Sequence, residues 1–337
     1  MPPRNAIFGL QETMPTAQER AFFRAVNPFG YILFARNIKD ADQVRALTES
    51  LREISGRDDL PILIDQEGGR VQRLRGPHFR EAPPAGKIAE LSRIDEKQGL
   101  RAAYLQALGI GAQLRKLGIT VDCAPCLDLR FEGASEVIGD RSYGNDPELV
   151  GKLGQAAIDG FRQAGVMPVI KHLPGHGRAL VDSHHGLPVI DTSLEILRKT
   201  DFRPFAACRQ KTWGMTAHLV LTEVDPDRPI TQSATGIKDI IRDTIGFSGP
   251  LMTDDLSMNA LTGEMTYRAD KALAAGCDLL LHCNGKFEEM ESVAEAVVPL
   301  SGKTLERINN TPVPKPAVHP GLADIEAELT ELLAPIR

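Results

Sequence analysis

Long hydrophobic runs are missing from this 337-residue sequence. No run approaches the roughly 18 apolar residues that a membrane-spanning helix needs. The first residues, Met-Pro-Pro-Arg-Asn-Ala-Ile-Phe, also lack the longer apolar core of a secretory signal peptide. These two absences predict a cytoplasmic protein that has no membrane partner.

Cysteine and net positive charge are scarce as well. The five cysteines are an odd number scattered along the chain, which does not fit a disulfide framework, so we expect reduced thiols. Cys123-Ala-Pro-Cys126 has the spacing of a redox motif, but it ends a predicted inner strand, and we expect it in the core. The formal charge of −6 argues against a nucleic-acid partner, which would require a basic face. Nothing indicates an obligate protein interface, so we expect a monomer.

Cofactor motifs are absent too. The one glycine pair near a strand end matches neither a P-loop nor a dinucleotide fingerprint. A metal-dependent barrel hydrolase would usually carry a His-x-His pair after its first strand, where this chain has Gly9-Leu10-Gln11. His172 and His176 have the spacing of a zinc-binding helix, but Pro174 and Gly175 break that helix. We expect no metal and no other cofactor, and we keep a metal-dependent hydrolase of an amide or ester as the alternative.

What the sequence does contain is a regular alternation of short apolar runs and longer amphipathic stretches. The expected strands are Ala6–Leu10, Tyr31–Phe34, Pro61–Ile64, Ile119–Cys123, Val166–Ile170, Trp213–Ala217, Pro250–Thr253 and Cys277–Leu281. The expected helices include Thr16–Asn27, Asp40–Ser55, Ile94–Leu117, Pro147–Ala164, Leu194–Lys211 and Ser233–Ile245. Gly118, Gly165 and Gly246 follow three of these helices as C-cap residues. The eightfold alternation predicts an α/β fold, a single (β/α)8 barrel of the TIM type, in which the first strand can be slightly irregular.

The C-terminal segment departs from this alternation. Thr311–Pro320 is too rich in proline for a helix or an inner strand, and it leads to an amphipathic stretch, Leu322–Leu333. We expect residues 1–310 to form the barrel domain, and residues 311–337 to form a linker and a helix packed on its outside.

Polar residues follow several of the expected strands. They are Asp65, Lys171 with His172, His218, Asp254 and His282. In a barrel these strand ends converge on the C-terminal rim, where active sites of this fold lie. Any one of them alone could be an ordinary polar residue that faces solvent, but five strands ending in this way predict a site.

The segment from Lys171 to His185 carries the clearest chemistry. Asp182 and His184 stand two residues apart, so the carboxylate can hold the imidazole and stabilise its protonated form, which makes His184 a candidate acid/base. Asp65 and an arginine returned by the next turn can hold vicinal hydroxyls of a sugar. A carboxylate at Asp254 and an imidazolium flanking one bond can together break an acetal. Adjacent residues on a strand point in opposite directions, so we expect only one of Asp254 and Asp255 to face the pocket. A sugar-binding protein without catalysis would not need all three of these groups.

These motifs resemble those of one family, the single-domain bacterial beta-N-acetylglucosaminidases of glycoside hydrolase family three. The resemblance runs from about Ile7 to Asn284. It is most specific in Lys171-His172-x-Pro174-Gly175-His176-Gly177-x4-Asp182-Ser183-His184, and Asp65-Gln66-Glu67-Gly68-Gly69-Arg70-Val71-Gln72-Arg73 supports it. Leu173, Thr253 and Asp140 stand where other members commonly have Phe, Ser and Glu, and His185 is an unusual neighbour of the Asp-Ser-His segment.

The resemblance implies a function and a set of site residues. Members are lone barrels that remove terminal N-acetylglucosamine from muropeptides during cell-wall recycling in the cytoplasm, without a metal. It implies that Asp254 is the nucleophile and that His184 is the acid/base with Asp182 as its partner. The sugar hydroxyls and the N-acetyl group would be held by Asp65, Arg73, Arg141, Lys171 and His172. Beta-glucosidases of the same family are the nearest alternative, but they usually take their acid from a second domain and lack the Asp-Ser-His loop.

Overall fold

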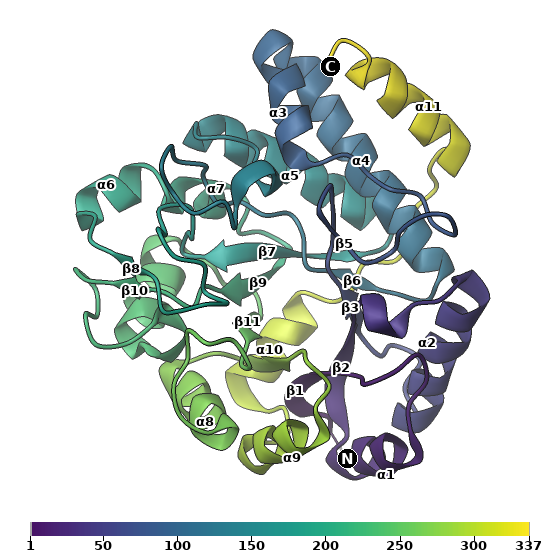
Figure 1. Cartoon of the computed structure of the whole chain (residues 1–337), viewed down its shortest axis with the longest axis vertical. Coiled ribbons are helices and arrows are strands. Elements are labelled where there is room, and N and C mark those ends of the chain that lie inside the picture. The colour runs from purple at the N-terminus through teal and green to yellow at the C-terminus, as the bar shows by residue number, and fades with distance from the viewer. Residues whose placement is uncertain (1, 337) are drawn as a thin grey trace.

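A computed structural model describes residues 2–336, and it shows a closed barrel of eight parallel strands surrounded by helices (Figure 1). In the order in which they are hydrogen-bonded, the strands are β1 (Arg4–Gly9), β12 (Leu279–His282), β11 (Leu251–Asp255), β9 (Trp213–Thr216), β7 (Met167–Leu173), β6 (Val121–Asp122), β3 (Ile62–Ile64) and β2 (Pro28–Leu33). Strand β2 pairs with β1 and closes the ring, with a register shift between Arg4 and Ile7. The predicted (β/α)8 barrel is confirmed, and every expected apolar run overlaps one of its strands.

The helices surround the ring of strands, except α10 (Gly302–Asn310), which lies across the ring in the view of Figure 1 and packs Ile308 against the barrel interior. They are α1 (Ala17–Val26), α2 (Ala41–Ser55), α3 (Ala85–Ile94), α4 (Glu96–Lys116), α5 (Pro147–Gln163), α6 (Leu194–Lys199), α7 (Phe202–Ala207), α8 (Met265–Ala275), α9 (Phe287–Ala296), α10 (Gly302–Asn310) and α11 (Leu322–Leu333), with a π-helical segment at Gly236–Thr244. Polar side chains cap their first turns: Thr16 and Glu19 form a capping box at α1, and Asp40 and Asp146 cap α2 and α5. Gly118, Gly165 and Gly246 have positive φ, as helix-terminating residues do.

Two of the expected helices are divided in the structure. The first is the expected helix Ile94–Leu117. Its first residue, Ile94, is the last residue of α3, and the rest forms α4, which begins at Glu96 after the cap residue Asp95. The expectation of one helix over Leu194–Lys211 is wrong, because α6 ends at Lys199 and α7 begins at Phe202. The carboxylate of Asp201, at this break, accepts a hydrogen bond of 2.8 Å from Arg178, so a tertiary contact competes with continuation of the helix.

The barrel has two apolar layers. One fills its interior with side chains such as Ile32, Met167 and Met252, and the other packs the strands against the helices. Leu300 joins the interior layer at the amino-terminal end, where the Trp213 indole donates to the carbonyl of Thr311 at 3.0 Å. That end is therefore packed, and the carboxyl end of the strands is left to form a pocket.

Helix α11 packs against α4, with Ile325 buried at the contact (Figure 1). Arg101 and Glu328 form a two-point ion pair across this contact, with distances of 2.7 and 2.8 Å. Among the helices of residues 2–336, none combines the length and apolarity that would be needed to cross a lipid bilayer.

Candidate active site

A pocket of about 880 Å³, which includes space open to solvent, lies at the carboxyl ends of the barrel strands. Its lining includes every residue to which the sequence assigned a catalytic or sugar-binding role: Asp65, Arg73, Arg141, Lys171, His172, Asp182, His184 and Asp254. His218 and His282, which were also expected at strand ends on this rim, are fully buried and do not line it. Apolar side chains of the barrel interior, among them Ile32, Met215 and Leu281, also line it. The structure thus brings together predicted site residues that are up to 189 positions apart in the chain, since Asp65 and Asp254 border the same cavity.

A short hairpin after β3 returns an arginine to Asp65. Strands β4 (Gln66–Gly68) and β5 (Val71–Gln72) pair antiparallel, and the Gln66 side chain accepts hydrogen bonds from the Arg73 and Leu74 amides. Gly68 has φ 98°, and a Cβ there would lie 2.3 Å from the Pro83 carbonyl oxygen, so the turn requires glycine. The Arg73 guanidinium consequently lies 3.1 Å from the Asp65 carboxylate.

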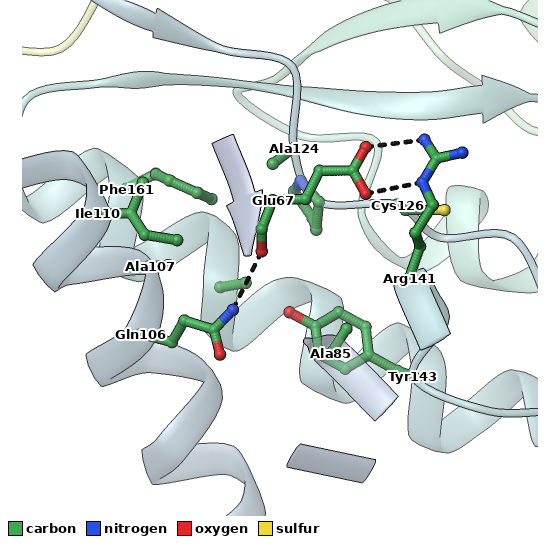
Figure 2. Close-up of a pocket in the computed structure, with 12 residues that line it drawn as sticks. Glu67, Ala85, Gln106, Ala107, Ile110, Ala124, Cys126, Arg141, Tyr143 and Phe161 are labelled. Carbon is green, nitrogen blue, oxygen red and sulfur yellow. Dashed lines mark hydrogen bonds and ion pairs between the residues drawn. The ribbon is translucent and has the colours of Figure 1, made fainter. Parts of the chain in front are cut away.

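Four charged side chains, all buried or half-buried, form one cluster: Asp65, Lys171 and Arg141 line the pocket, and Glu67 lies behind them. Lys171 Nζ lies 2.8 Å from Asp65 Oδ1 and 2.7 Å from Glu67 Oε1, and Arg141 binds both oxygens of Glu67 at 2.8 and 2.9 Å. Figure 2, which draws a neighbouring pocket lined by Glu67 and Gln106, shows this two-point pair, with Gln106 donating to the Glu67 backbone carbonyl. Burial opposes charge on both carboxyls, but the neighbouring cations outweigh it, so the pKa of Asp65 is lowered and that of Glu67 falls to about 2. The pKa of Lys171 is raised by the same two carboxylates against the effect of burial.

Replacing Glu67 by glutamine should reveal this charge cluster as a pH-dependent contribution to stability. The Glu67 carboxylate is favoured in the folded state because its pKa falls from 4.5 to about 2. Its contribution is therefore complete above pH ~4.5 and is lost as the pH falls toward 2. We expect Glu67→Gln to lower the free energy of unfolding by about 3 kcal/mol at pH 7, because it leaves buried cations under-compensated.

Urea unfolding of both proteins at pH 7 and near pH 3 measures this effect, and the difference between them should shrink at the lower pH. Glu96→Gln is the matched control, since Glu96 pairs with Lys152 at the same 2.7 Å but at the exposed surface, where the loss should stay below about 1 kcal/mol. A difference for Glu67→Gln that is equal at both pH values would contradict the expected role of its charge.

Asp128 fixes the orientation of His172, one of the two histidines that line the pocket. Its Oδ2 lies 2.6 Å from His172 Nδ1, and its Oδ1 accepts from the His176 amide at 2.6 Å. The carboxyl has a lowered pKa because His172 and His176 stabilise the anion more than burial disfavours it. Since Nδ1 is engaged in this way, Nε2 is the nitrogen that His172 has left for a ligand.

The same residues contain one group that could be considered for a metal ion. Cys126, Asp128 and His172 offer buried ligand atoms within 4.8 Å of one another. However, the 2.6 Å between His172 Nδ1 and Asp128 Oδ2 is a hydrogen-bond length, whereas two ligands of a tetrahedral zinc ion would lie roughly 3.3 Å apart. Burial also raises the pKa of the Cys126 thiol well above its usual value, which disfavours the thiolate that a metal needs. The donor set fits a hydrogen-bonded support for His172 better than a metal site.

Asp254 lies at the end of β11, facing these groups. Burial works against its charge, but His172, His218 and the Asp255 amide outweigh it, and they lower the pKa of Asp254. It is therefore an ionised carboxylate at neutral pH. The expectation that only one of Asp254 and Asp255 borders the pocket is wrong, because both do. The register of β11 shifts between Met252 and Asp255, so strict alternation does not extend to its end.

Asp182 and His184 lie on a loop at the mouth of the pocket. His184 Nδ1 is 2.7 Å from Asp182 Oδ1, and the same oxygen accepts from the His184 amide at 2.9 Å. Partial burial opposes ionisation of Asp182, but these two hydrogen bonds lower its pKa overall. The His184 side chain is 63% exposed, in contrast to the other groups of the pocket. The loop thus presents an imidazole to solvent and to the cavity together.

Sequence reasoning missed the supporting residues. Glu67 lies in the same stretch as Asp65, yet it was not recognised as a partner of Arg141. Asp128 and Asp255 were also missed as supports, because their partners lie on other strands. His218, one of the polar residues expected at a strand end, is buried and bonds Thr231 at 2.7 Å and the Asp255 carbonyl at 3.0 Å, so it has a structural role.

A closed (β/α)8 barrel with a polar pocket at the carboxyl ends of its strands defines an enzyme that acts on a small polar molecule. The model of the family described as "Glycosyl hydrolase family 3 N terminal domain" matches residues 11–312. The chain therefore belongs to glycosyl hydrolase family 3, and the expectation that it is a glycoside hydrolase is confirmed.

Similar proteins carry more specific names. The chain is 36% identical to a "Beta-hexosaminidase" of Idiomarina loihiensis, over 87% of this chain and 88% of that protein. It is 39% identical to a "Beta-hexosaminidase" of Chromobacterium violaceum, over 84% of this chain and 79% of the relative. The fold matches NagZ from Neisseria gonorrhoeae in complex with N-trifluoroacetyl-D-glucosamine, with a TM-score of 0.87, 28% identity, and coverage of 100% and 99% of the two chains. The resemblance to the beta-N-acetylglucosaminidases of this family is therefore confirmed.

Proposed function

We propose that this protein is a retaining exo-glycosidase that hydrolyses terminal beta-linked N-acetylglucosamine. The observation that carries the proposal is the composition of one pocket. An ionised Asp254 and the Asp182–His184 pair border the same cavity as polar and charged side chains that can hydrogen-bond the hydroxyls of a sugar. The names of the relatives, and the N-acyl glucosamine bound to the similar gonococcal protein, support the choice of sugar.

In the proposed mechanism, Asp254 attacks the anomeric carbon while His184 protonates the departing oxygen. The bond to the leaving group breaks as a covalent glycosyl ester of Asp254 forms, and the configuration at that carbon is inverted. His184 then takes a proton from water, which attacks the same carbon and restores the original configuration. Asp182 stabilises the imidazolium, so one residue serves as acid in the first step and as base in the second.

In this proposal, the sugar is positioned by the charged cluster of Asp65, Glu67, Lys171 and Arg141 together with two neighbours, His172 and Arg73. Lys171 has three N–H donors, of which two are directed at Asp65 and Glu67, so one is left for a hydroxyl. His172 can donate or accept through Nε2, and Asp65 has further lone pairs. Arg73 and Arg141 complete the set, and Arg141 is oriented by Glu67.

We extend the proposal to the natural substrate and the place of action. We propose that the protein releases N-acetylglucosamine from muropeptides that end in N-acetylglucosaminyl-anhydro-N-acetylmuramic acid, in cell-wall recycling in the cytoplasm. No cofactor is needed for the two steps above, because the nucleophile and the acid/base are both side chains of this chain.

Comparing two nitrophenyl substrates tests the choice of sugar and the need for a metal. We expect kcat/KM for the N-acetylglucosaminide to exceed that for the glucoside by at least about 100-fold, since a site built to bond the acetamido group leaves polar groups unpaired with glucose. Preference for the glucoside would instead favour a beta-glucosidase. Exhaustive chelation should leave the rate unchanged, and a loss restored by added metal would favour a metal-dependent hydrolase. A parallel reaction with phosphate, followed by product analysis, identifies the acceptor.

A further inference from the structure

The loop that carries Asp182 and His184 has few contacts with the barrel. Leu180 and Val181 expose 74% and 47% of their surface, and the His184 side chain is exposed as well. The Asp182–His184 hydrogen bonds lie within the loop, so they orient the imidazole relative to the loop alone. Contacts that join the loop to the rest of the protein must decide where the imidazole lies relative to Asp254.

Three hydrogen bonds at Ser183 and His184 provide such contacts. The buried Ser183 hydroxyl lies 3.3 Å from His176 Nε2, and the Ser183 carbonyl accepts from the Ala260 amide at 3.2 Å. The His184 carbonyl accepts from the side-chain amide of Asn259 at 2.9 Å. Two of the three hydrogen bonds therefore come from Asn259 and Ala260, in the turn that follows strand β11 and Asp254.

That turn is itself held firmly. The Asp255 carboxylate accepts from the Ser257 amide at 3.0 Å and from its hydroxyl at 2.6 Å. Arg268 donates to the carbonyls of Leu256 and Met258 at 2.8 and 3.2 Å. Asn259 is exposed at the tip of this turn, so its amide reaches outward from a fixed base to a loosely held loop.

We propose that Asn259 is a positioning residue for the acid/base, which couples the loop of His184 to the turn of Asp254. Its amide holds the His184 backbone, so that the imidazole stays over the pocket when the leaving oxygen needs a proton. This inference rests on the proposed function of Asp254 and His184. A neutral hydrogen bond at an exposed site contributes modestly to stability. Its loss should therefore change the equilibrium between the held and released positions of the loop by a factor of about three to ten.

The variants Asn259→Ala and Asn259→Asp test the proposal. Aspartate has nearly the same shape as asparagine but accepts hydrogen bonds without donating them, so both changes remove the contact. We expect hydrogen exchange of amides in residues 180–187 to become about three- to tenfold faster, with no change in residues 251–258. We also expect kcat/KM for an N-acetylglucosaminyl disaccharide, which reports formation of the glycosyl-enzyme alone, to fall about three- to tenfold, while kcat/KM for the nitrophenyl glycoside stays within about twofold.

The split between the two substrates separates positioning from general damage, because nitrophenol leaves with little protonation. Asn310→Ala, at the exposed end of α10 on the amino-terminal side of the barrel, is the matched control and should change neither quantity. Unchanged exchange in residues 180–187, or an equal loss of kcat/KM with both substrates, would overturn the proposal. Failure of the proposed function would look different, since Asp254→Ala would then retain activity whatever the exchange result at Asn259.

Discussion

Replacing Asp254 by alanine should lower turnover of N-acetylglucosaminides by about 1000-fold or more, while binding of the sugar survives. The carboxylate is the group that forms the covalent intermediate in our proposal, and removing it leaves only water to attack a poorly activated carbon. The binding groups Asp65, Lys171 and His172 keep their own hydrogen bonds without Asp254. Steady-state kinetics and calorimetric titration with N-acetylglucosamine measure the two quantities.

A small anion offers a sharper test of the same assignment. Azide entering the space left in Asp254→Ala can attack the anomeric carbon from the side that the carboxylate occupied, giving a glycosyl azide of inverted configuration, while His184 still protonates the leaving group. Asp227→Ala removes an exposed aspartate from another loop and should have near-normal activity, as the matched control. Near-normal activity of Asp254→Ala would eliminate Asp254 as the nucleophile, and so would a rescued product of retained configuration.

Much of the fold could be predicted because the apolar runs of a parallel barrel are buried on both faces and stand out from amphipathic helices. Strands such as β6 are only two residues long in the structure, yet their apolar flanks marked them in the sequence. Pro204 in the first turn of α7 was a signal for the break at Asp201, because proline has no amide hydrogen to donate to Thr200, whereas the ion pair of Asp201 with Arg178 could not be predicted. Helices α8 and α9 were not identified, although Gly276 follows α8 as a left-handed C-cap.

In the candidate site, too, some residues could be predicted from the sequence and others could not. Residues at strand ends, such as Asp65, Lys171 and Asp254, could be found because the end of a strand places a side chain on the rim of a barrel. Glu67 and Asp128 act through partners more than 40 positions away, and no local pattern identifies such pairs. The sequence therefore predicted groups that line the pocket, while the groups that fix their charge and orientation required the structure.

Replacing His184 by alanine should give a loss that depends on the leaving group. An N-acetylglucosaminyl disaccharide needs a proton on its departing oxygen, so its turnover should fall by about 10²- to 10⁴-fold, the range that a general acid contributes. Nitrophenol departs as a stable anion, so formation of the glycosyl-enzyme from the nitrophenyl substrate should fall far less. The second step still lacks its base, and the intermediate should accumulate after a burst of nitrophenol.

Azide again discriminates between assignments, with the opposite stereochemical result. It attacks the accumulated intermediate without a base and should restore turnover of His184→Ala, giving a glycosyl azide of retained configuration, in contrast to the inverted product expected from Asp254→Ala. His185→Ala is the matched control, because His185 is an exposed histidine on the same loop and should tolerate the change. A uniform loss across leaving groups, without a burst or azide rescue, would show that His184 does not transfer the proton. The expected pair of azide products, inverted from Asp254→Ala and retained from His184→Ala, would instead place the nucleophile and the acid/base on opposite faces of one sugar.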